Sequence, residues 1–505
     1  MNNTEVMKIN ILIFLLFISF ETCNAQYFLM TDTVDLGVPR FDIDELRKRL
    51  DEIDSTGFVS FSGERNVLRY QLAESLFYSF DEDEQIESIK LCEDIMKCSD
   101  AKSIAAAANC IAIAYYKGSH GYPQDYCKAF AYWQKACYKF GYSDRRIVTT
   151  QMYNLGCCYY YGKGCEKNIS KAIECWHGSD FHPHSFNNLA VCYWENGDYQ
   201  KAYNMFYKAA NESNNSNAIR SLCYLHANGY IGEDSLSRNQ NVLYYIDKGI
   251  KNRDSFCHYI MGTIYEKGGY GIDIDKEKAI SEYESAWFVP EAKRNLGEIY
   301  LWDNNIEKSK YYFSEAADKN DTYSQYMLGM LNCYIPNITN YSNLKALSYQ
   351  PTEDKFSFIN GIEWLEKSAN NGNWEALDKI ANFYFYGNVI ENDSVLKRDY
   401  NKSLMYFEKL VDIEQNDSLV SNLSKAEHNA ILGIHYNLGL GIKKDYVKAT
   451  TYYSNSIKYG GTCAAYNNLG GCYEDGLGVD KDLKKAYELY SMAVYKDSTD
   501  TYSLA

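Results

Sequence analysis

Four side chains suited to metal binding lie close together in this sequence. They are Cys175, His177, His182 and His184. Thiolate and imidazole are donors that zinc accepts, and a closed zinc site needs four of them within tetrahedral reach. Their spacing matches no standard zinc finger, and Pro183 makes the segment resemble a plain connection between helices. The cluster is therefore a weak candidate for a metal site, and we predict no cofactor.

Motifs of the common catalytic classes are missing from the sequence. It contains no Gly-x-Ser-x-Gly elbow, no Gly-x-x-x-x-Gly-Lys phosphate loop, no His-Glu-x-x-His and no Cys-x-x-Cys. Each of these spacings places a nucleophile, a phosphate group or a metal ion where the chemistry needs it. We therefore predict no catalytic residues and a protein that is not an enzyme.

Cysteine is abundant, with 16 residues, of which ten fall between Cys92 and Cys192. In an exported chain such residues can form disulfides. Residues about 17 apart across a helical hairpin come near each other, and a bridge needs Cα atoms no more than about 7 Å apart. We predict a bridge from Cys157 or Cys158 to Cys175. The alternative is that many cysteines are small buried hydrophobic residues on helix faces.

An apolar segment opens the chain. Lys8 precedes an apolar run from Ile9 to Phe20, and Ala25 ends the segment. This order of charge, apolar core and small residue is typical of a secretory signal peptide, with cleavage after Ala25. The run is short for a membrane span, and no other stretch approaches about 18 apolar residues. We predict an exported protein, periplasmic or extracellular, with no transmembrane segment after signal removal. The alternative is a retained N-terminal anchor.

The charge of the chain limits its partners. A formal net charge of −16 and a pI near 5.1 argue against nucleic acid, whose phosphates need a basic stripe. Protein or peptide partners fit this charge better. The 49 tyrosines could line a groove for such a partner, because tyrosine combines a flat apolar face with a polar tip. The alternative is that most of them pack between helices.

The elements that position these residues follow from a repeat. Leu155-Gly156, Leu432-Gly433 and Leu469-Gly470 each open the spacing Leu-Gly-x-x-Tyr-x-x-Gly-x-Gly, and a Lys-Ala pair follows each time. A repeated unit of this size is one supersecondary element that must stack on its neighbours to bury its apolar face. The residues that define the repeat are Leu155, Gly156, Tyr159, Ala172, Gly262, Ala279, Gly297, Leu432, Gly433, Tyr436, Ala449, Leu469, Gly470, Tyr473 and Ala486.

The repeat divides the chain into segments. Residues 1–25 are the predicted signal peptide, and 26–65 are a leader with one helix from Asp42 to about Asp54. An atypical helical hairpin spans 66–104, the repeats span 105–497 with an insertion at about 335–357, and 498–505 are a short polar tail. The last helix is expected to stop near Tyr495 and to leave an apolar face partly open, formed by Leu489, Met492 and Ala493. That face predicts docking or weak self-association through the C-terminal repeat, and the alternative is a frayed terminus.

The segments Ala465 to Tyr490 and Ala430 to Tyr453 resemble the Sel1-like repeat. The resemblance covers roughly residues 100 to 497. It implies an all-α fold, a right-handed α-solenoid of about ten helix-turn-helix repeats of the tetratricopeptide class. It also implies an adaptor or scaffold in multiprotein assemblies, and it transfers no catalytic residue to this chain.

We therefore predict an exported scaffold that binds a peptide or protein partner on a solenoid surface. The alternative is an enzyme, because some cysteine-rich secreted Sel1-like proteins are associated with penicillin binding or weak β-lactam hydrolysis. Lys135-Ala136-Cys137 resembles a helix ending of that group. The partner cysteine expected about eight residues later is absent, since Arg145 occupies that place.

Overall fold

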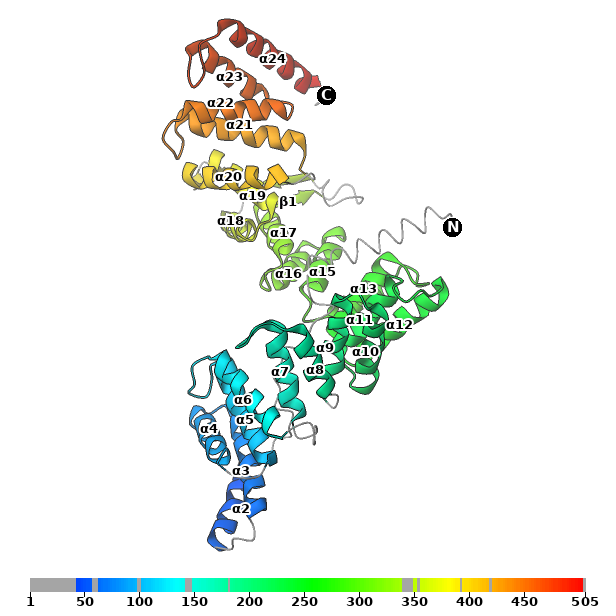
Figure 1. Cartoon of the computed structure of the whole chain (residues 1–505). Helices are drawn as coiled ribbons and strands as arrows, with labels where there is room; N and C mark the ends of the chain where they lie inside the picture. The colour runs from blue at the N-terminus through cyan, green and yellow to red at the C-terminus, as the bar shows by residue number, and fades with distance from the viewer. Residues whose placement is uncertain are drawn as a thin grey trace. The chain divides into compact units, whose positions relative to one another are not determined.

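The computed structural model describes residues 42–56, 62–97, 101–140, 148–179, 182–337, 348–351, 355–390, 393–416 and 420–502 (Figure 1). The predicted signal peptide and the first part of the leader lie outside these residues. The chain divides into two compact units, an N-terminal unit up to Ala279 and a C-terminal unit from Ile280. Within the described parts of both units, every helix is too short or too polar to cross a lipid bilayer.

The N-terminal unit consists of helices only, as far as the chain is described there. They are α2 (Ile43–Thr56), α3 (Ser62–Phe77), α4 (Glu82–Ile95), α5 (Ala101–Lys117), α6 (Tyr126–Phe140), α7 (Thr149–Tyr161), α8 (Ile169–Gly178), α9 (Ser185–Glu195), α10 (Tyr199–Glu212), α11 (Ser216–Ala227), α12 (Ser235–Lys251) and α13 (Ser255–Lys267). Helix α14 (Lys276–Ser285) spans the division between the units. The helix expected from Asp42 to Asp54 corresponds to α2.

The C-terminal unit combines helices with four short strands. Its helices are α15 (Pro290–Trp302), α16 (Ile306–Ala317), α17 (Thr322–Cys333), α18 (Lys355–Asn370), α19 (Trp374–Tyr386), α20 (Tyr400–Asn416), α21 (Asn422–Leu438), α22 (Tyr446–Lys458), α23 (Cys463–Asp475) and α24 (Leu483–Tyr502). Its strands are β1 (Tyr334–Asn337), β2 (Ser348–Pro351), β3 (Asn388–Ile390) and β4 (Asp393–Leu396).

Helices that follow each other in the chain pack against each other as hairpins. In the N-terminal unit α5 packs on α6 and α9 on α10, and in the C-terminal unit α15 packs on α16 and α21 on α22 (Figure 1). The helices from α5 to α24 form ten consecutive pairs in chain order. The prediction of an all-α solenoid of about ten repeats is thereby confirmed, and α3 with α4 forms a further hairpin before them.

The repeat glycine lets an aromatic ring of the second helix touch the backbone of the first. A Cβ atom would lie 2.6 Å from Trp176 at Gly156, 2.8 Å from Phe313 at Gly297 and 2.8 Å from Tyr490 at Gly470. Real Cβ atoms do not approach other atoms so closely. The repeat leucines and alanines fill the space around these contacts and are buried at Leu155, Leu432, Leu469, Ala172, Ala279, Ala449 and Ala486.

The Gly-x-Gly loop has a second structural reason. Gly476 ends α23 in the left-handed conformation with φ +74°, which costs glycine little because it has no Cβ. Gly478 also has φ +74°, and a Cβ there would collide with the carbonyl group of Tyr446, the first residue of α22. The loop of one repeat thus rests on the helix start of the previous repeat. Asp482 then begins α24, since its Oδ1 accepts a hydrogen bond from Lys485 N at 3.0 Å.

Two β-hairpins lie between helices of the C-terminal unit. Strand β1 pairs antiparallel with β2, from Tyr334 opposite Pro351 to Asn337 opposite Ser348, inside the insertion predicted at 335–357. Strand β3 pairs with β4 and carries an irregularity after Asn388. Val389, Ile390 and Val395 are β-branched residues, which favour strands over helices.

The prediction that the last helix stops near Tyr495 is wrong. Helix α24 continues to Tyr502, seven residues beyond Tyr495, because no glycine or proline interrupts it there. In the face that was predicted to stay partly open, Leu489 packs against the core and Ala493 is buried, whereas Met492 is 42% exposed. Among its described side chains, α24 exposes the apolar residues Leu483, Tyr487, Met492, Val494 and Tyr495.

Candidate functional site

The four predicted metal donors do not converge on one point. Cys175 and His177 lie on α8, whereas His182 and His184 lie in the turn that leads into α9. His177 Nε2 is 3.0 Å from the hydroxyl oxygen of Tyr193. Across the described ranges, no group of three or more histidine, cysteine, aspartate or glutamate side chains could hold a metal ion. The weak metal candidate is therefore not supported.

The other two histidines of that cluster join neighbouring repeats. The His182 ring stacks on the Tyr153 ring of α7 with 3.8 Å between their centres, and His182 is buried. His184 Nδ1 lies 2.9 Å from Asn215 Nδ2, at the start of α11. Each imidazole is thus held by a protein partner from a different helix, and this explains why histidines gather in the sequence here.

The structure does not contain the predicted disulfide from Cys157 or Cys158 to Cys175. None of the fourteen cysteines in the described part of the chain forms a disulfide in this structure. Cys157 lies on the side of α7 that faces α9, since its Sγ is 4.0 Å from Asn188 Nδ2. Successive residues of a helix point about 100° apart, so Cys158 points in a different direction from Cys157. Burial, together with the nearby Cys175 thiol, raises the pKa of Cys137 to about 12. Burial likewise raises the pKa of Cys175 to about 12, so neither is a good nucleophile at neutral pH.

The tyrosine of the repeat motif packs against the lysine of the following Lys-Ala pair. The distance from the lysine Nζ to the ring centre is 5.3 Å for Lys171 over Tyr159, 5.0 Å for Lys448 over Tyr436 and 4.3 Å for Lys485 over Tyr473. Such a cation–π contact stabilises by about 0.5–1 kcal/mol at exposed sites. Tyr436 also donates a hydrogen bond of 2.6 Å to Glu408 of the preceding repeat. For these tyrosines the packing alternative holds, and they are not free to line a groove.

An aromatic pocket of about 340 Å³ lies where both β-hairpins begin. We call it the aromatic pocket; its lining residues are Tyr334, Phe358, Lys379, Asn382, Phe383, Tyr386 and Gly387. Phe358 meets Phe383 edge to face with 5.3 Å between ring centres, and Tyr334 stacks on Phe383 at 6.0 Å. Phe358 is buried, whereas Tyr386 is 61% exposed. The pocket therefore has a fixed aromatic floor and an accessible aromatic rim.

Polar groups at this pocket are few and placed at its edge. Lys379 Nζ lies 3.5 Å from Asp378 Oδ2, and its side chain is 40% exposed. Asn382 Nδ2 donates to Asp378 Oδ1 at 2.8 Å. Burial raises the pKa of Tyr334 to about 12, so its hydroxyl group is neutral and can donate a hydrogen bond at physiological pH.

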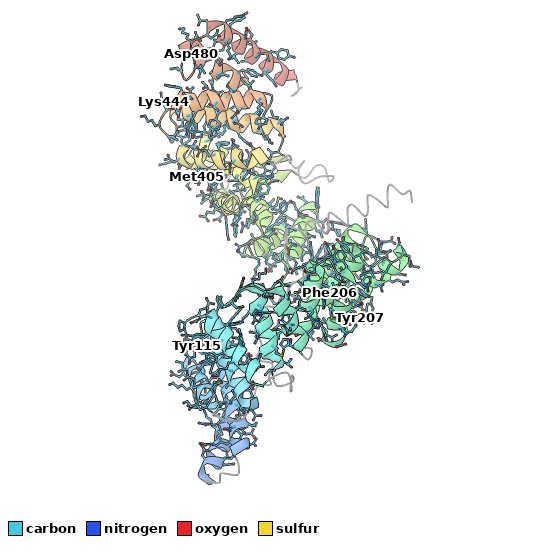
Figure 2. The ribbon with its side chains drawn as sticks, in the orientation of Figure 1. Tyr115, Phe206, Tyr207, Met405, Lys444 and Asp480 are labelled. Carbon is cyan, nitrogen blue, oxygen red and sulfur yellow. The ribbon has the colours of Figure 1, made fainter. Side chains whose placement is uncertain are left out.

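The sequence analysis did not single out any residue of the aromatic pocket. The run Phe383 to Tyr386 was a signal, since four successive aromatic residues on one helix cannot all face the core. Helix α10 has a similar division, since Phe206 is buried and Tyr207 is 49% exposed. Both residues are labelled in Figure 2. Sequence alone does not indicate which exposed ring borders a cavity.

Comparison with protein families gives a clear match. The model described as "Sel1 repeat" matches nine segments that make up more than half of the chain. They are residues 105–139, 152–177, 187–214, 255–284, 290–321, 357–373, 374–412, 429–458 and 463–498. The resemblance found in the sequence is confirmed.

Individual proteins are similar over shorter stretches or at lower identity. The Sel1-repeat-containing protein YjcO of Escherichia coli K12 is 26% identical over 161 residues, which are 32% of this chain and 58% of YjcO. The Arabidopsis thaliana ERAD-associated E3 ubiquitin-protein ligase component HRD3B is 27% identical over 231 residues, 44% of this chain and 33% of that protein. The crystal structure of a protective antigen of uropathogenic Escherichia coli, with an SLR fold, aligns over 90% of this chain and 87% of its own, with 18% identity and a TM-score of 0.45.

Proposed function

The chain belongs to the Sel1 repeat family, and we propose that it is an exported scaffold that binds a peptide segment of a partner protein in the aromatic pocket. Members of this family typically mediate protein–protein interaction. Export is supported by the charged, apolar and small-residue order within residues 1–25. The net charge of −16 favours a partner whose binding segment is basic.

The observation that carries the proposal is the combination of aromatic floor and exposed rim. Binding hot spots are enriched in tyrosine and other aromatic residues that form well-packed pockets. Phe358 and Phe383 fix the floor, and Tyr386 offers an accessible ring at its edge. A volume of about 340 Å³ can accept an apolar anchor side chain of a peptide. Lys379 and Asn382 can meet the peptide backbone at the rim.

No chemistry of its own is proposed for the chain. Cys137, which belongs to the motif Lys135-Ala136-Cys137, and its neighbour Cys175 are partly buried, and pKa values of about 12 keep both thiols protonated at neutral pH. Sel1 repeat scaffold proteins are generally non-catalytic. Incubation of the chain with a chromogenic β-lactam and a fluorescent penicillin tests this part. Turnover or covalent labelling above a denatured control contradicts it.

Peptide selection tests the proposed site directly. A displayed library of random peptides is selected on the purified chain from residue 26, and the dissociation constants of enriched peptides are measured by fluorescence polarisation. We expect the peptides to share one apolar anchor. Tyr386→Ala should weaken them at least tenfold, because loss of a hot-spot side chain costs about 2 kcal/mol or more and about 1.4 kcal/mol corresponds to tenfold. Tyr207→Ala, which removes a similarly exposed ring from α10, should leave the affinity unchanged.

Two outcomes argue against the proposal. One is the absence of enriched peptides on a chain that is folded by circular dichroism. The other is equal affinity for Tyr386→Ala and the unmodified chain, which moves binding to another surface. Export is tested separately, by fractionation of cells that express the full chain or a chain without residues 2–25, and retention of both in the cytoplasm contradicts it.

A further inference from the structure

A second cavity, separate from the aromatic pocket, lies between α20, α21 and α22. Its volume is about 240 Å³. The side chains that line it are mostly polar: Val411, Glu414, Lys425, Asn429, Asn455, Lys458 and Tyr459. Because these residues come from three consecutive helices of the C-terminal unit, the cavity is a product of repeat stacking.

The floor of this cavity carries negative charge. Glu414 is 2% exposed, and its Oε1 lies 2.6 Å from His428 Nδ1. The other ring nitrogen of His428 lies 3.1 Å from Asp378 Oδ1. Burial alone lowers the pKa of His428, but the hydrogen bonds to Asp378 and Glu414 outweigh it and raise the pKa to about 9. His428 thus contacts both carboxylates, Lys379 lies 3.5 Å from Asp378 Oδ2, and Glu414 is the acidic side chain that lines the cavity.

Two of the residues that line the cavity each have a buried acceptor atom without a hydrogen-bond partner among the described residues. These atoms are Glu414 Oε2 and Asn429 Oδ1. Asn429 is 3% exposed, and its Nδ2 already donates to Lys425 O at 2.8 Å, so its oxygen is the atom left over. A buried polar atom without a partner costs about 1–3 kcal/mol, and more when it is charged. A hydrogen-bond donor next to these two oxygens would therefore stabilise this part of the chain.

The rim of the same cavity carries positive charge. Lys425 and Lys458 both line it, and Tyr459 lies between them. Their Nζ atoms are 5.7 Å and 6.0 Å from the centre of the Tyr459 ring. The cavity therefore has two acceptor oxygens at the floor and two ammonium groups at the rim.

We propose that this cavity binds a small zwitterion, with a primary ammonium group on Glu414 Oε2 and Asn429 Oδ1 and a carboxylate between Lys425 and Lys458. The ligand class is a free α-amino acid or a short peptide that carries both charged ends. The ammonium supplies the hydrogens that the two oxygens need. The carboxylate meets the lysines in charge-assisted hydrogen bonds, which are about twice as strong as neutral ones.

A ligand with a single charge can pair either with the two acceptor oxygens or with the two ammonium groups of the cavity, but not with both. An anion alone leaves the acceptors of Glu414 and Asn429 without a donor. A metal cation finds only one carboxylate among the lining residues and is repelled by two lysines, whereas calcium takes six to eight oxygens, several of them from carboxylates. A single water occupies about 30 Å³ of liquid volume, far less than this cavity. Both charges on one small molecule match all four groups.

Isothermal titration calorimetry tests the proposal on the purified chain from residue 26. The probes are the twenty L-amino acids, each at up to 10 mM, and the dipeptide Gly-Gly, whose charged ends are further apart. For each probe that binds, its N-acetyl and its amide derivative remove one charge at a time. We expect at least one zwitterion to bind and both derivatives to lose at least tenfold in affinity.

Variants connect the binding to this cavity. Lys458→Met changes an exposed side chain and should weaken the zwitterion at least tenfold, and Asn429→Leu should do the same. Lys444→Met removes an exposed lysine from the loop between α21 and α22, outside the cavity, and should change nothing (Figure 2). If Asn429→Leu does not fold, the affinity of Lys458→Met for the zwitterion still tests the proposal.

Three results would overturn the proposal. They are no heat from any probe, equal binding of the N-acetyl or amide derivative, and unchanged affinity in Lys458→Met. Binding of free amino acids identifies them as the ligand, and binding of Gly-Gly alone identifies a peptide. Both outcomes leave the peptide selection on Tyr386→Ala untouched, so the two sites are tested independently.

Discussion

The close contact between Gly297 and Phe313 predicts that a single methyl group destabilises the repeat formed by α15 and α16. In Gly297→Ala the new Cβ would lie 2.8, 2.9 and 2.9 Å from three atoms of the Phe313 ring. Phe313 is fully buried, so its ring has no room to turn away. Gly471→Ala is the matched control, since its Cβ would lie 3.6 Å from the Tyr490 hydroxyl oxygen, an ordinary contact.

Two opposing effects set the magnitude. Alanine in place of glycine stabilises a helix interior by about 1 kcal/mol. Overpacking of a close-packed core costs about 1–3 kcal/mol, and contact with three ring atoms at once places Gly297→Ala near the upper end. We therefore expect a net loss of about 1–2 kcal/mol in Gly297→Ala and a gain of up to about 1 kcal/mol in Gly471→Ala. The two substitutions should differ in sign although their chemistry is identical.

Native-state hydrogen exchange with detection by mass spectrometry is the suitable assay. Each repeat of such an array depends on its neighbours, so global unfolding need not be two-state. Amides of α15 and α16 should exchange about tenfold faster in Gly297→Ala, since about 1.4 kcal/mol corresponds to a factor of ten. The added change Phe313→Leu should reduce the effect. Equal or slower exchange in Gly297→Ala would refute the close-contact explanation of the repeat glycine.

Three further predictions concern charge, thiols and the last helix. His428 has its pKa raised from 6.5 to about 9, so its stabilisation is complete below about pH 6.5 and is lost as the pH rises through 9. The thermal midpoint of the unmodified chain should fall more between pH 7 and pH 9.5 than that of His428→Gln, and equal slopes would contradict the charge assignment. Iodoacetamide at pH 8 should modify the exposed Cys127 well before the partly buried Cys175, whose pKa burial raises to about 12, as peptide mapping can show. Equal rates would contradict the raised pKa of Cys175. Val494 is 70% exposed on α24, and Val494→Glu should lower the average mass that light scattering gives at high protein concentration, whereas an unchanged mass speaks against self-association through this helix.

The fold could be predicted from the sequence because its determinants are local and repeated. Leu-Gly, the motif tyrosine and Lys-Ala recur at fixed spacing, and each has a contact within one hairpin, as Gly470 has with Tyr490 and Lys485 with Tyr473. Contacts between residues a few dozen positions apart recur in every repeat, so they produce a periodic pattern in the sequence. The helix before the repeats, α2, was also found from its own pattern.

The candidate sites depend on contacts that produce no periodic pattern in the sequence. The aromatic pocket needs Tyr334 and Tyr386, which come from the two hairpin starts, and the second cavity needs Glu414, Asn429 and Lys458 from three helices. None of these residues belongs to the repeat motif, so their spacing carries no signal. The weak candidate for a metal site near Cys175 is not supported for the same reason. Its four donors are close in sequence, but their side chains do not converge on one point. The sequence by itself determined a stack of helical hairpins, and only the tertiary structure decided which polar and aromatic side chains share a cavity, because convergence depends on the direction of each side chain across stacked repeats.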